Sequence, residues 1–126
     1  MIKILLVEDN EMNRDMLTRR LLRQGFAVVC AMDVPAGVAM ASSEAPDIIL
    51  MDVALGAMDG WEATTKIKAN PATATIPVIA LTAHALASDR DRSIAAGCSD
   101  FDTKPIDLPR LLGKIHGCLA QMAKVA

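Results

Sequence analysis

Four short apolar runs, separated by segments with helical signals, each end on polar residues of a different chemical kind. They are residues 4–7 before Glu8 and Asp9, residues 48–51 before Asp52, residues 78–81 before Thr82, and the stretch around Phe101 before Lys104. Apolar runs of this length with turn signals after them are typical of buried strands. In an open parallel sheet the carboxyl ends of the strands share one edge, where ligands bind. The pattern therefore predicts three carboxylates, one hydroxyl and one ammonium at a single site.

Between the runs lie signals for helices. Asn10 can cap a first helix that ends at Gly25, Asp33 can cap a short second helix, and Asp107 can cap the last one. A third helix is expected over about residues 61–69 and a weaker fourth over about residues 86–96. The residues expected on apolar helix faces are Met12, Met16, Leu17 and Leu21, then Val38 and Ala39, and finally Leu108, Leu111, Leu112, Ile115 and Leu119. With a further strand at residues 26–31, the alternation predicts an α/β fold, a doubly wound five-stranded parallel sheet with five helices.

Composition limits the possible functions of the chain. At 126 residues and 52% hydrophobic content, it is expected to form one domain, residues 1–126, with a core of its own. A net charge of −2 and 2% aromatic residues argue against a nucleic-acid partner. No run of apolar residues is long enough for a membrane span, and the chain enters a strand at once, without a signal peptide. Three cysteines without metal spacing suit a reducing cytoplasm, so we expect a cytoplasmic protein.

The residues at the strand ends suit the transfer of a phosphoryl group. Adjacent Glu8 and Asp9, with Asp52 at another strand end, form an oxygen cluster suited to Mg²⁺, although the first two alone could be a solvated turn. Asp52 is the candidate nucleophile, since a carboxylate can attack phosphorus and carry an acyl phosphate. Lys104 and Thr82 could then bind the remaining phosphoryl oxygens. Pro105 after Lys104 leaves open whether their peptide bond is cis.

At these residues the chain resembles the receiver domains of two-component response regulators, the chemotaxis-regulator-like fold. The matching segments are residues 6–10, 50–52 with 58–60, 80–83 and 103–106. The resemblance implies the flavodoxin-like strand order 2-1-3-4-5 and a phosphoacceptor, Asp52, that receives phosphate from a histidine kinase or a histidine phosphotransfer protein. It further implies Mg²⁺ bound by Asp9, Asp52 and the main-chain carbonyl of Ala54, with Glu8 acting through water. Thr82 and Lys104 would contact the phosphoryl oxygens.

The resemblance also implies a switch, and the chain departs from the family at three positions. Thr82 would move toward the phosphate while Phe101 turns inward. Gly56 stands where the family usually has proline, which loosens the loop after Asp52. The positions that flank the phosphoryl group hold Ala54 and His84. Because Ala54 cannot orient water through its side chain, we expect the phosphate to hydrolyse slowly.

Several functions fit these residues. The favoured hypothesis is a stand-alone, single-domain response regulator, since the chain stops soon after its last expected helix. It would assist its own phosphorylation without being an enzyme, and signal as a monomer or weak dimer through the face of the fourth helix, fifth strand and last helix. The alternative is a phosphorelay shuttle that passes phosphate from Asp52 to a histidine phosphotransfer protein. An aspartyl phosphatase is disfavoured because Ala54 supplies no general acid, and a nucleotide-binding module because no Gly-rich loop follows the first run.

Overall fold

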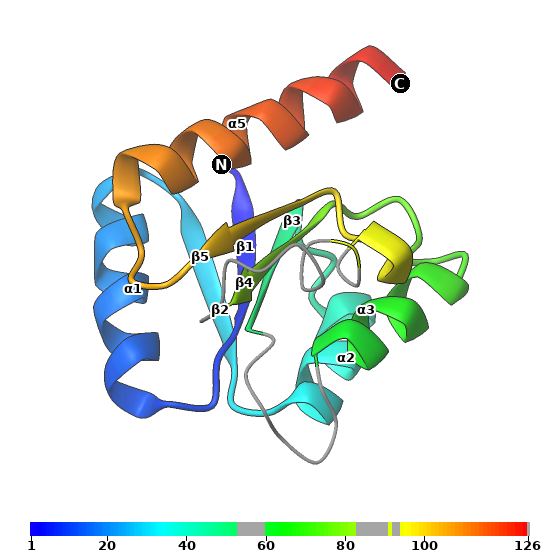
Figure 1. The fold of residues 1–126 in the computed structure, drawn as a ribbon, viewed down its shortest axis with the longest axis horizontal. Coiled ribbons are helices and arrows are strands. Elements are labelled where there is room, and N and C mark those ends of the chain that lie inside the picture. Colours follow the sequence, from blue (N-terminus) through cyan, green and yellow to red (C-terminus); the bar gives the residue numbers. More distant parts are fainter. Residues whose placement is uncertain (53–59, 83–90, 92–93, 126) are drawn as a thin grey trace.

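The computed structural model describes residues 1–52, 60–82, 91 and 94–125, which contain five strands and four helices with defined bounds (Figure 1). The strands are β1 (Lys3–Val7), β2 (Ala27–Ala31), β3 (Ile48–Asp52), β4 (Val78–Thr82) and β5 (Asp100–Thr103). The helices are α1 (Glu11–Arg23), α2 (Val34–Ser43), α3 (Gly60–Ala69) and α5 (Leu108–Val125). Residues 91 and 94–96 are also helical, in the segment where the fourth helix is expected.

The strands form one parallel sheet in the order β2-β1-β3-β4-β5. All five strands therefore end at the same edge, as the sequence pattern predicts. The register pairs Val7 with Met51 and Thr82 with Thr103. The residues that follow β1 and β5 are thus brought to the level of the last residues of β3 and β4. The predicted fold class and strand order are confirmed.

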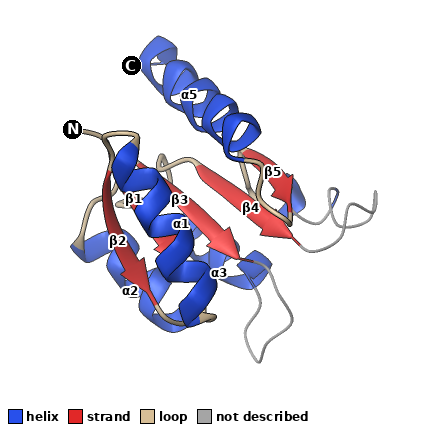
Figure 2. Cartoon of the chain, turned by 90° about the vertical axis from the view of Figure 1, so that its left-hand side faces the viewer, coloured by secondary structure: helices blue, strands red, loops and turns tan. Residues whose placement is uncertain are grey.

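Helices cover both faces of the sheet, and each face has its own core (Figure 2). Leu6, Leu50 and Leu81 point toward α1 and α5, where they pack with buried residues of both helices. Leu5, Ile49 and Ala80 point the other way, toward α2 and α3. The central strands β1, β3 and β4 are buried almost throughout, because apolar side chains alternate between two covered faces. The site therefore lies at the ends of the most buried strands of the sheet.

Helix caps fall where the sequence places them. The side chains of Asn10 and Asp33 accept hydrogen bonds from the main-chain N–H groups of Asn13 and Ala36, three residues on. Asp107 does the same for Arg110 at the start of α5. Gly25, with a φ of +89°, follows α1 in the left-handed region that glycine adopts without a steric penalty. Local capping chemistry thus explains why these helices begin where they do.

Two predicted helix faces need correction. Met12 and Met16 are exposed, and only Leu17 and Leu21 of the expected α1 set are buried. In α2 the buried residues are Gly37 and Ala41, whereas Ala39 is exposed and Val38 half-buried. A β-carbon at Gly37 would lie 2.7 Å from a methyl group of Val7, so α2 packs too close to β1 for any side chain there. Hydrophobicity alone misjudged both faces: the close approach of α2 to β1 requires small residues, and in α1 only Leu17 and Leu21 reach the core.

Among the described residues, none of the helices combines the length and the apolar character needed to span a bilayer.

Candidate functional site

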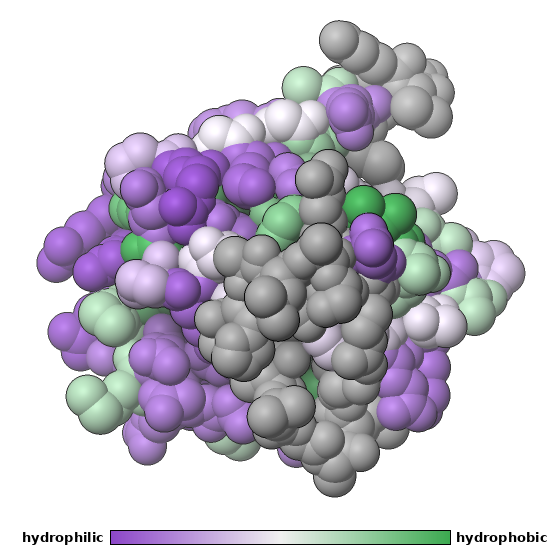
Figure 3. Space-filling model, viewed as in Figure 1, coloured by the Kyte–Doolittle hydropathy of each residue, from purple (hydrophilic) through white to green (hydrophobic). Residues whose placement is uncertain are grey.

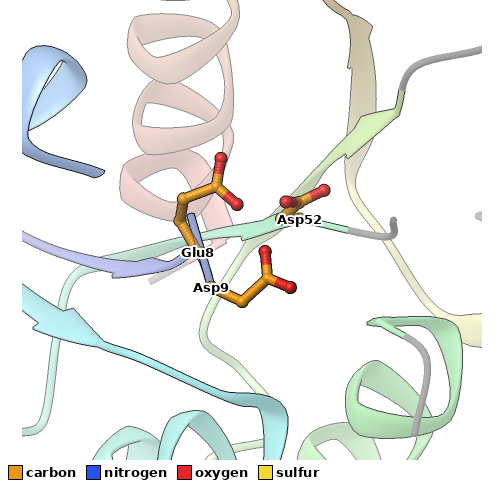
Figure 4. Close-up of side chains that lie close together, drawn as sticks. All are labelled: Glu8, Asp9 and Asp52. Atoms are coloured by element: carbon orange, nitrogen blue, oxygen red, sulfur yellow. The ribbon is translucent and has the colours of Figure 1, made fainter. Parts of the chain in front are cut away.

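Three carboxylates gather where β1 and β3 end. Glu8 directly follows β1 and Asp52 is the last residue of β3, and both side chains are buried. Asp9, the next residue, is exposed. One oxygen from each of the three lies within 4.8 Å of the others, and the three side chains face a common space (Figure 4). The predicted convergence of the carboxylates is therefore observed.

Lys104 supplies the opposite charge. It follows β5, and its main-chain N–H donates to the carbonyl of Thr82 at 2.7 Å. Its Nζ donates to Asp52 Oδ2 at 3.0 Å and to Glu8 Oε1 at 3.3 Å. The Lys104–Pro105 peptide bond, which the sequence left open, is cis. One ammonium is thus shared between two buried carboxylates.

Charge and burial shift two pKa values at this site. Burial, reinforced by the neighbouring Asp52 carboxylate, raises the pKa of Glu8 to about 7, and Lys104 offsets only part of that rise. Burial alone would lower the pKa of Lys104, but the hydrogen bonds and charges of Asp52 and Glu8 outweigh it and hold that pKa above its ordinary value. The site therefore holds a fixed ammonium and an excess of negative charge.

Thr82 and Phe101, the two residues of the predicted switch, lie on the paired strands β4 and β5. Thr82 is the last residue of β4, is buried, and lies beside Thr103 in the sheet register. Phe101 is half-buried against the core on the α2 and α3 side, and the Lys114 ammonium lies 5.4 Å from its ring centroid. Thr82 thus places a hydroxyl next to the site, and Phe101 places an aromatic ring on β5, as the predicted switch requires. Their movement stays a prediction.

The family model described as "Response regulator receiver domain" matches residues 4–116. The chain belongs to this family. Because the match runs from β1 into α5, it includes all the strand ends that carry the site.

Known proteins resemble this receiver domain along most of its length. The response regulator PleD of Caulobacter vibrioides is 42% identical over 114 residues, which are 90% of this chain and 25% of PleD, so the chain spans a quarter of that relative. The protein PilH of Pseudomonas aeruginosa is 35% identical over 120 residues, 95% of this chain and 99% of PilH. A solved receiver domain of the sensor histidine kinase PA1611 from Pseudomonas aeruginosa PAO1 has a magnesium ion coordinated in its active-site cleft. It shares 35% identity and a TM-score of 0.86, covering 94% of this chain and 98% of that one.

The receiver domain's acidic cluster fits a divalent cation. Three carboxylates face one ammonium, and the second oxygen of Glu8, Oε2, is buried and has no hydrogen-bond partner in the part of the chain that the structure describes. An unbonded buried carboxylate oxygen beside like charges is costly, and a hard cation with its bound waters would satisfy it. Receiver domains bind Mg²⁺ at an acidic site, and this donor set, all oxygen, suits that ion. The carbonyl of Ala54, the fourth expected ligand, lies outside the described residues, as do Gly56 and His84.

Three residues around the site were missed by the sequence reasoning. Arg14 of α1 donates from Nη1 to the main-chain carbonyl of Glu8 at 2.9 Å. Asp102 of β5 is buried, and Arg110 of α5 donates to it from Nε at 2.7 Å. A charged residue at an inward position of a strand is the signal that could have drawn attention to Asp102. No comparable pattern marks either arginine, because their bonds to main-chain carbonyls depend on the path of the turns after β1 and β5.

An open groove leads away from the site along α1. Its volume is about 480 Å³, and it lies between α1 and the turn after β5. The walls include Met16 and Arg20 of α1 and Ile106 after β5, while Glu8 and Lys104 lie at its inner end. The exposure of Met16, which contradicted the predicted apolar face, is explained by this groove. A partner's side chain could approach Glu8 and Lys104 along it.

Proposed function

We propose that the chain is a single-domain response regulator that accepts a phosphoryl group on Asp52 in a magnesium-dependent reaction. The observation that carries this proposal is the Lys104 ammonium, which bonds Asp52 at 3.0 Å and Glu8 at 3.3 Å inside a cluster of three carboxylates. A nucleophilic carboxylate next to a fixed cation, with further acids on its other side, is what transfer to an aspartate requires. The full-length match to PilH supports a domain, residues 1–126, that acts by itself.

The transfer uses one nucleophile, Asp52, and two groups that bind phosphoryl oxygens. An oxygen of Asp52 attacks phosphorus in line with the bond to the donor, and the new O–P bond forms as the old bond breaks. With a phosphohistidine donor whose other ring nitrogen is protonated, the leaving group is a neutral imidazole that keeps the electron pair. Lys104 neutralises a phosphoryl oxygen, and the hydroxyl of Thr82 donates to another.

The acidic residues divide the remaining work. Asp9, Asp52 and the main-chain carbonyl of Ala54 would hold Mg²⁺ directly, and Glu8 would hold one of its waters. The ion supplies charge neutralisation for the transferring group when it is bound. Glu8 and Asp52 come from neighbouring strands, so their spacing is set before the ion arrives. The magnesium ion in the receiver domain of PA1611 supports this assignment.

The output of the switch would be a protein surface. Thr82 would move toward the phosphate, and Phe101 would turn into the space it leaves, changing the face that β5 and α5 form with the fourth helix. The partners would be a sensor histidine kinase or a histidine phosphotransfer protein upstream and an effector protein downstream, in the cytoplasm, with the chain a monomer or weak dimer.

The groove beside α1 supports a protein as the phosphate donor. It opens from Glu8 and Lys104, which bond each other beside Asp52, to the surface, so a histidine carried on a partner's helix could approach this end of the site. The same access would serve a phosphorelay shuttle, which differs only in passing the phosphate on. Mixing the phosphorylated protein with candidate phosphotransfer proteins separates the two, because only a shuttle loses its label to them within minutes.

One experiment tests the proposal as a whole. The protein is treated with acetyl phosphate with and without Mg²⁺, beside the variant D52A, and acid-stable and acid-labile phosphate are measured. We expect labelling that requires both Mg²⁺ and Asp52, followed by retention of effector proteins on the labelled form alone. Equal labelling of D52A would refute the assignment of Asp52. Steady turnover of a small phosphate ester would instead indicate a phosphatase.

A further inference from the structure

We propose that Arg110, anchored by Asp102, is a positioning residue for Lys104. The two residues lie outside the acidic cluster, on α5 and β5, and the sequence pattern assigned them no role. Their contacts nevertheless converge on the main chain just before Lys104, which carries the ammonium of the site. This inference rests on the proposed function and adds to it the residues that hold the ammonium in place.

The peptide group between Thr103 and Lys104 is fixed from both sides. Its carbonyl oxygen, on Thr103, accepts a hydrogen bond from Arg110 Nη2 at 3.1 Å. Its N–H, on Lys104, donates to the carbonyl of Thr82 at 2.7 Å. One bond comes from α5 and the other from the end of β4, so the plane of this peptide cannot rotate unless one of them breaks. The direction in which the Lys104 side chain leaves the backbone is set by that plane.

Asp102 holds the guanidinium that makes this contact. Its Oδ1 accepts from Arg110 Nε at 2.7 Å and from the main-chain N–H of Thr103 at 2.8 Å. Asp102 lies beside Leu81 in the register, so its side chain points to the α1 and α5 side, and only 2% of that side chain is exposed. The side chain of Arg110 is 44% exposed. Without the carboxylate of Asp102 it would be solvated and would adopt several conformations. The buried carboxylate keeps the planar fork of Arg110 aimed at the Thr103 carbonyl.

The arrangement is costly as a purely structural device. The second oxygen of Asp102, Oδ2, is buried and accepts no hydrogen bond from any described residue. An ion pair that buries one of its charges in this way is often no more stabilising than apolar residues of similar size. Its clearest consequence is therefore geometric: it fixes one carbonyl next to a residue whose Nζ must sit 3.0 Å from Asp52. Figure 3 shows hydrophilic side chains gathered over the start of α5, the region to which this pair belongs.

Lys114 provides a matched control on the same helix. It lies four residues after Arg110, and its Nζ also bonds a β5 carbonyl, that of Phe101 at 2.7 Å, and a β5 carboxylate, that of Asp100 at 3.5 Å. The two residues thus make the same kinds of contact between α5 and β5. Only the contact of Arg110 involves the peptide that leads into Lys104. A loss of phosphorylation rate in the Arg110 variants alone would therefore reflect the positioning of Lys104 and not a general loosening of α5.

The test measures Asp52 phosphorylation by acetyl phosphate, Mg²⁺ affinity and urea stability in four variants. R110A strands the buried carboxylate, so the double variant D102L/R110A removes both charges and keeps the core filled. In that variant we expect the rate constant at saturating donor to fall on the order of tenfold, because a misplaced group loses catalytic effect steeply. Its Mg²⁺ affinity and its urea midpoint should stay at or above those of the wild type. R110K should recover stability relative to R110A but only part of the rate, because one ammonium cannot bond both partners in the guanidinium's geometry.

K114A should show the opposite behaviour, with a lower urea midpoint and an unchanged rate constant. A wild-type rate in D102L/R110A, or equal slowing in K114A, overturns the positioning role. D52A and K104A are measured alongside, so that the two proposals fail separately. If D52A is labelled as well as the wild type, the proposed function is wrong. If labelling needs Asp52 and Lys104 but not Arg110, only the positioning role is wrong.

Discussion

Two buried carboxylates in this molecule, Glu8 after β1 and Asp102 on β5, are built alike and surrounded differently. Each has one oxygen bonded to a basic side chain and a second oxygen that has no hydrogen-bond partner among the described residues. The partner of Glu8 is the ammonium of Lys104, which Glu8 shares with Asp52. The partner of Asp102 is the guanidinium of Arg110, and the main-chain N–H of Thr103 adds a second bond.

The neighbours of the two residues explain their different roles. Glu8 lies among like charges, and burial with the Asp52 carboxylate raises its pKa to about 7, so the site around it has room for added positive charge. Asp102 has a cation that the structure assigns to no other carboxylate among the described residues. The comparison teaches that a buried carboxylate with a shared counter-ion can accept a further cation. A buried carboxylate with a counter-ion of its own can instead hold that counter-ion in one position.

The largest expected effect is the loss of stability when Asp102 loses its partner Arg110. Replacing Arg110 by alanine should lower the free energy of unfolding by about 3 kcal/mol, because it leaves the Asp102 carboxylate buried and unpaired. Urea unfolding followed by circular dichroism measures this value. The variant D102L, which removes the charge together with its need for a partner, is the control and should be far less destabilised. Equal losses in the two variants would break the distinction drawn here.

The opposite sign is expected at Glu8. Its pKa lies above the ordinary value of 4.5 in the folded protein, so the free energy of unfolding falls as the pH rises from about 4.5 to about 7. At pH 8 without metal, E8Q should therefore be more stable than the wild type by about 2 kcal/mol, a gain that disappears near pH 4. Urea midpoints at both pH values measure the effect. A loss of stability in E8Q at pH 8 would show that the bond to Lys104 outweighs the crowding of charges.

Magnesium binding should follow the same titration. Protons compete with the ion for Glu8, so Mg²⁺ affinity should rise by about tenfold, or about 1.4 kcal/mol, between pH 6 and pH 8. Fluorescence of Trp61, the single tryptophan, at the start of α3, or calorimetry in buffers of different ionisation heat would follow the binding. D102N, which removes a carboxylate outside the cluster, should show the same pH dependence of Mg²⁺ affinity as the wild type. A flat profile in the wild type would argue that Glu8 has no contact with the ion or its waters.

The smallest effect on stability is expected at Asp9, the exposed member of the cluster. D9N should change the free energy of unfolding by less than about 0.5 kcal/mol, as surface substitutions generally do. The same variant should weaken Mg²⁺ binding and slow the labelling of Asp52, since it removes a proposed direct ligand. Parallel urea and metal titrations separate these effects. Unchanged metal affinity in D9N would remove Asp9 from the proposed ligand set.

Much of this architecture could be predicted from the residues themselves. The apolar runs identified the strands, and the polar residues after them identified the cluster, because parallel strands end at one edge. The capping residues Asn10, Asp33 and Asp107 fixed where three helices begin. These features depend on local chemistry and on a single topological rule, so sequence patterns suffice for them.

What escaped prediction depends on contacts between distant segments. Met16 belongs to an apolar stripe of α1 but lines an open groove, and no local pattern reveals what a helix face will meet. Gly37 is buried because α2 approaches Val7 closely, a fact of packing and not of hydrophobicity. The Arg110 contact to the Thr103 carbonyl requires a turn whose path the sequence left undecided. Long-range geometry, and not residue chemistry, was the missing information.

The register of β1 against β3 has one more consequence. Glu8 directly follows β1 and Asp52 is the last residue of β3, two strands that hydrogen-bond to each other, and neighbouring strands are spaced about 4.8 Å apart by the backbone. The separation between these two carboxylates is therefore set by the sheet. Substitutions in the caps and surfaces around them would leave that separation unchanged, whereas a wider one would require a different sheet. In the proposed magnesium site, the distance between the direct ligand Asp52 and the water-holding Glu8 would thus be built into the backbone.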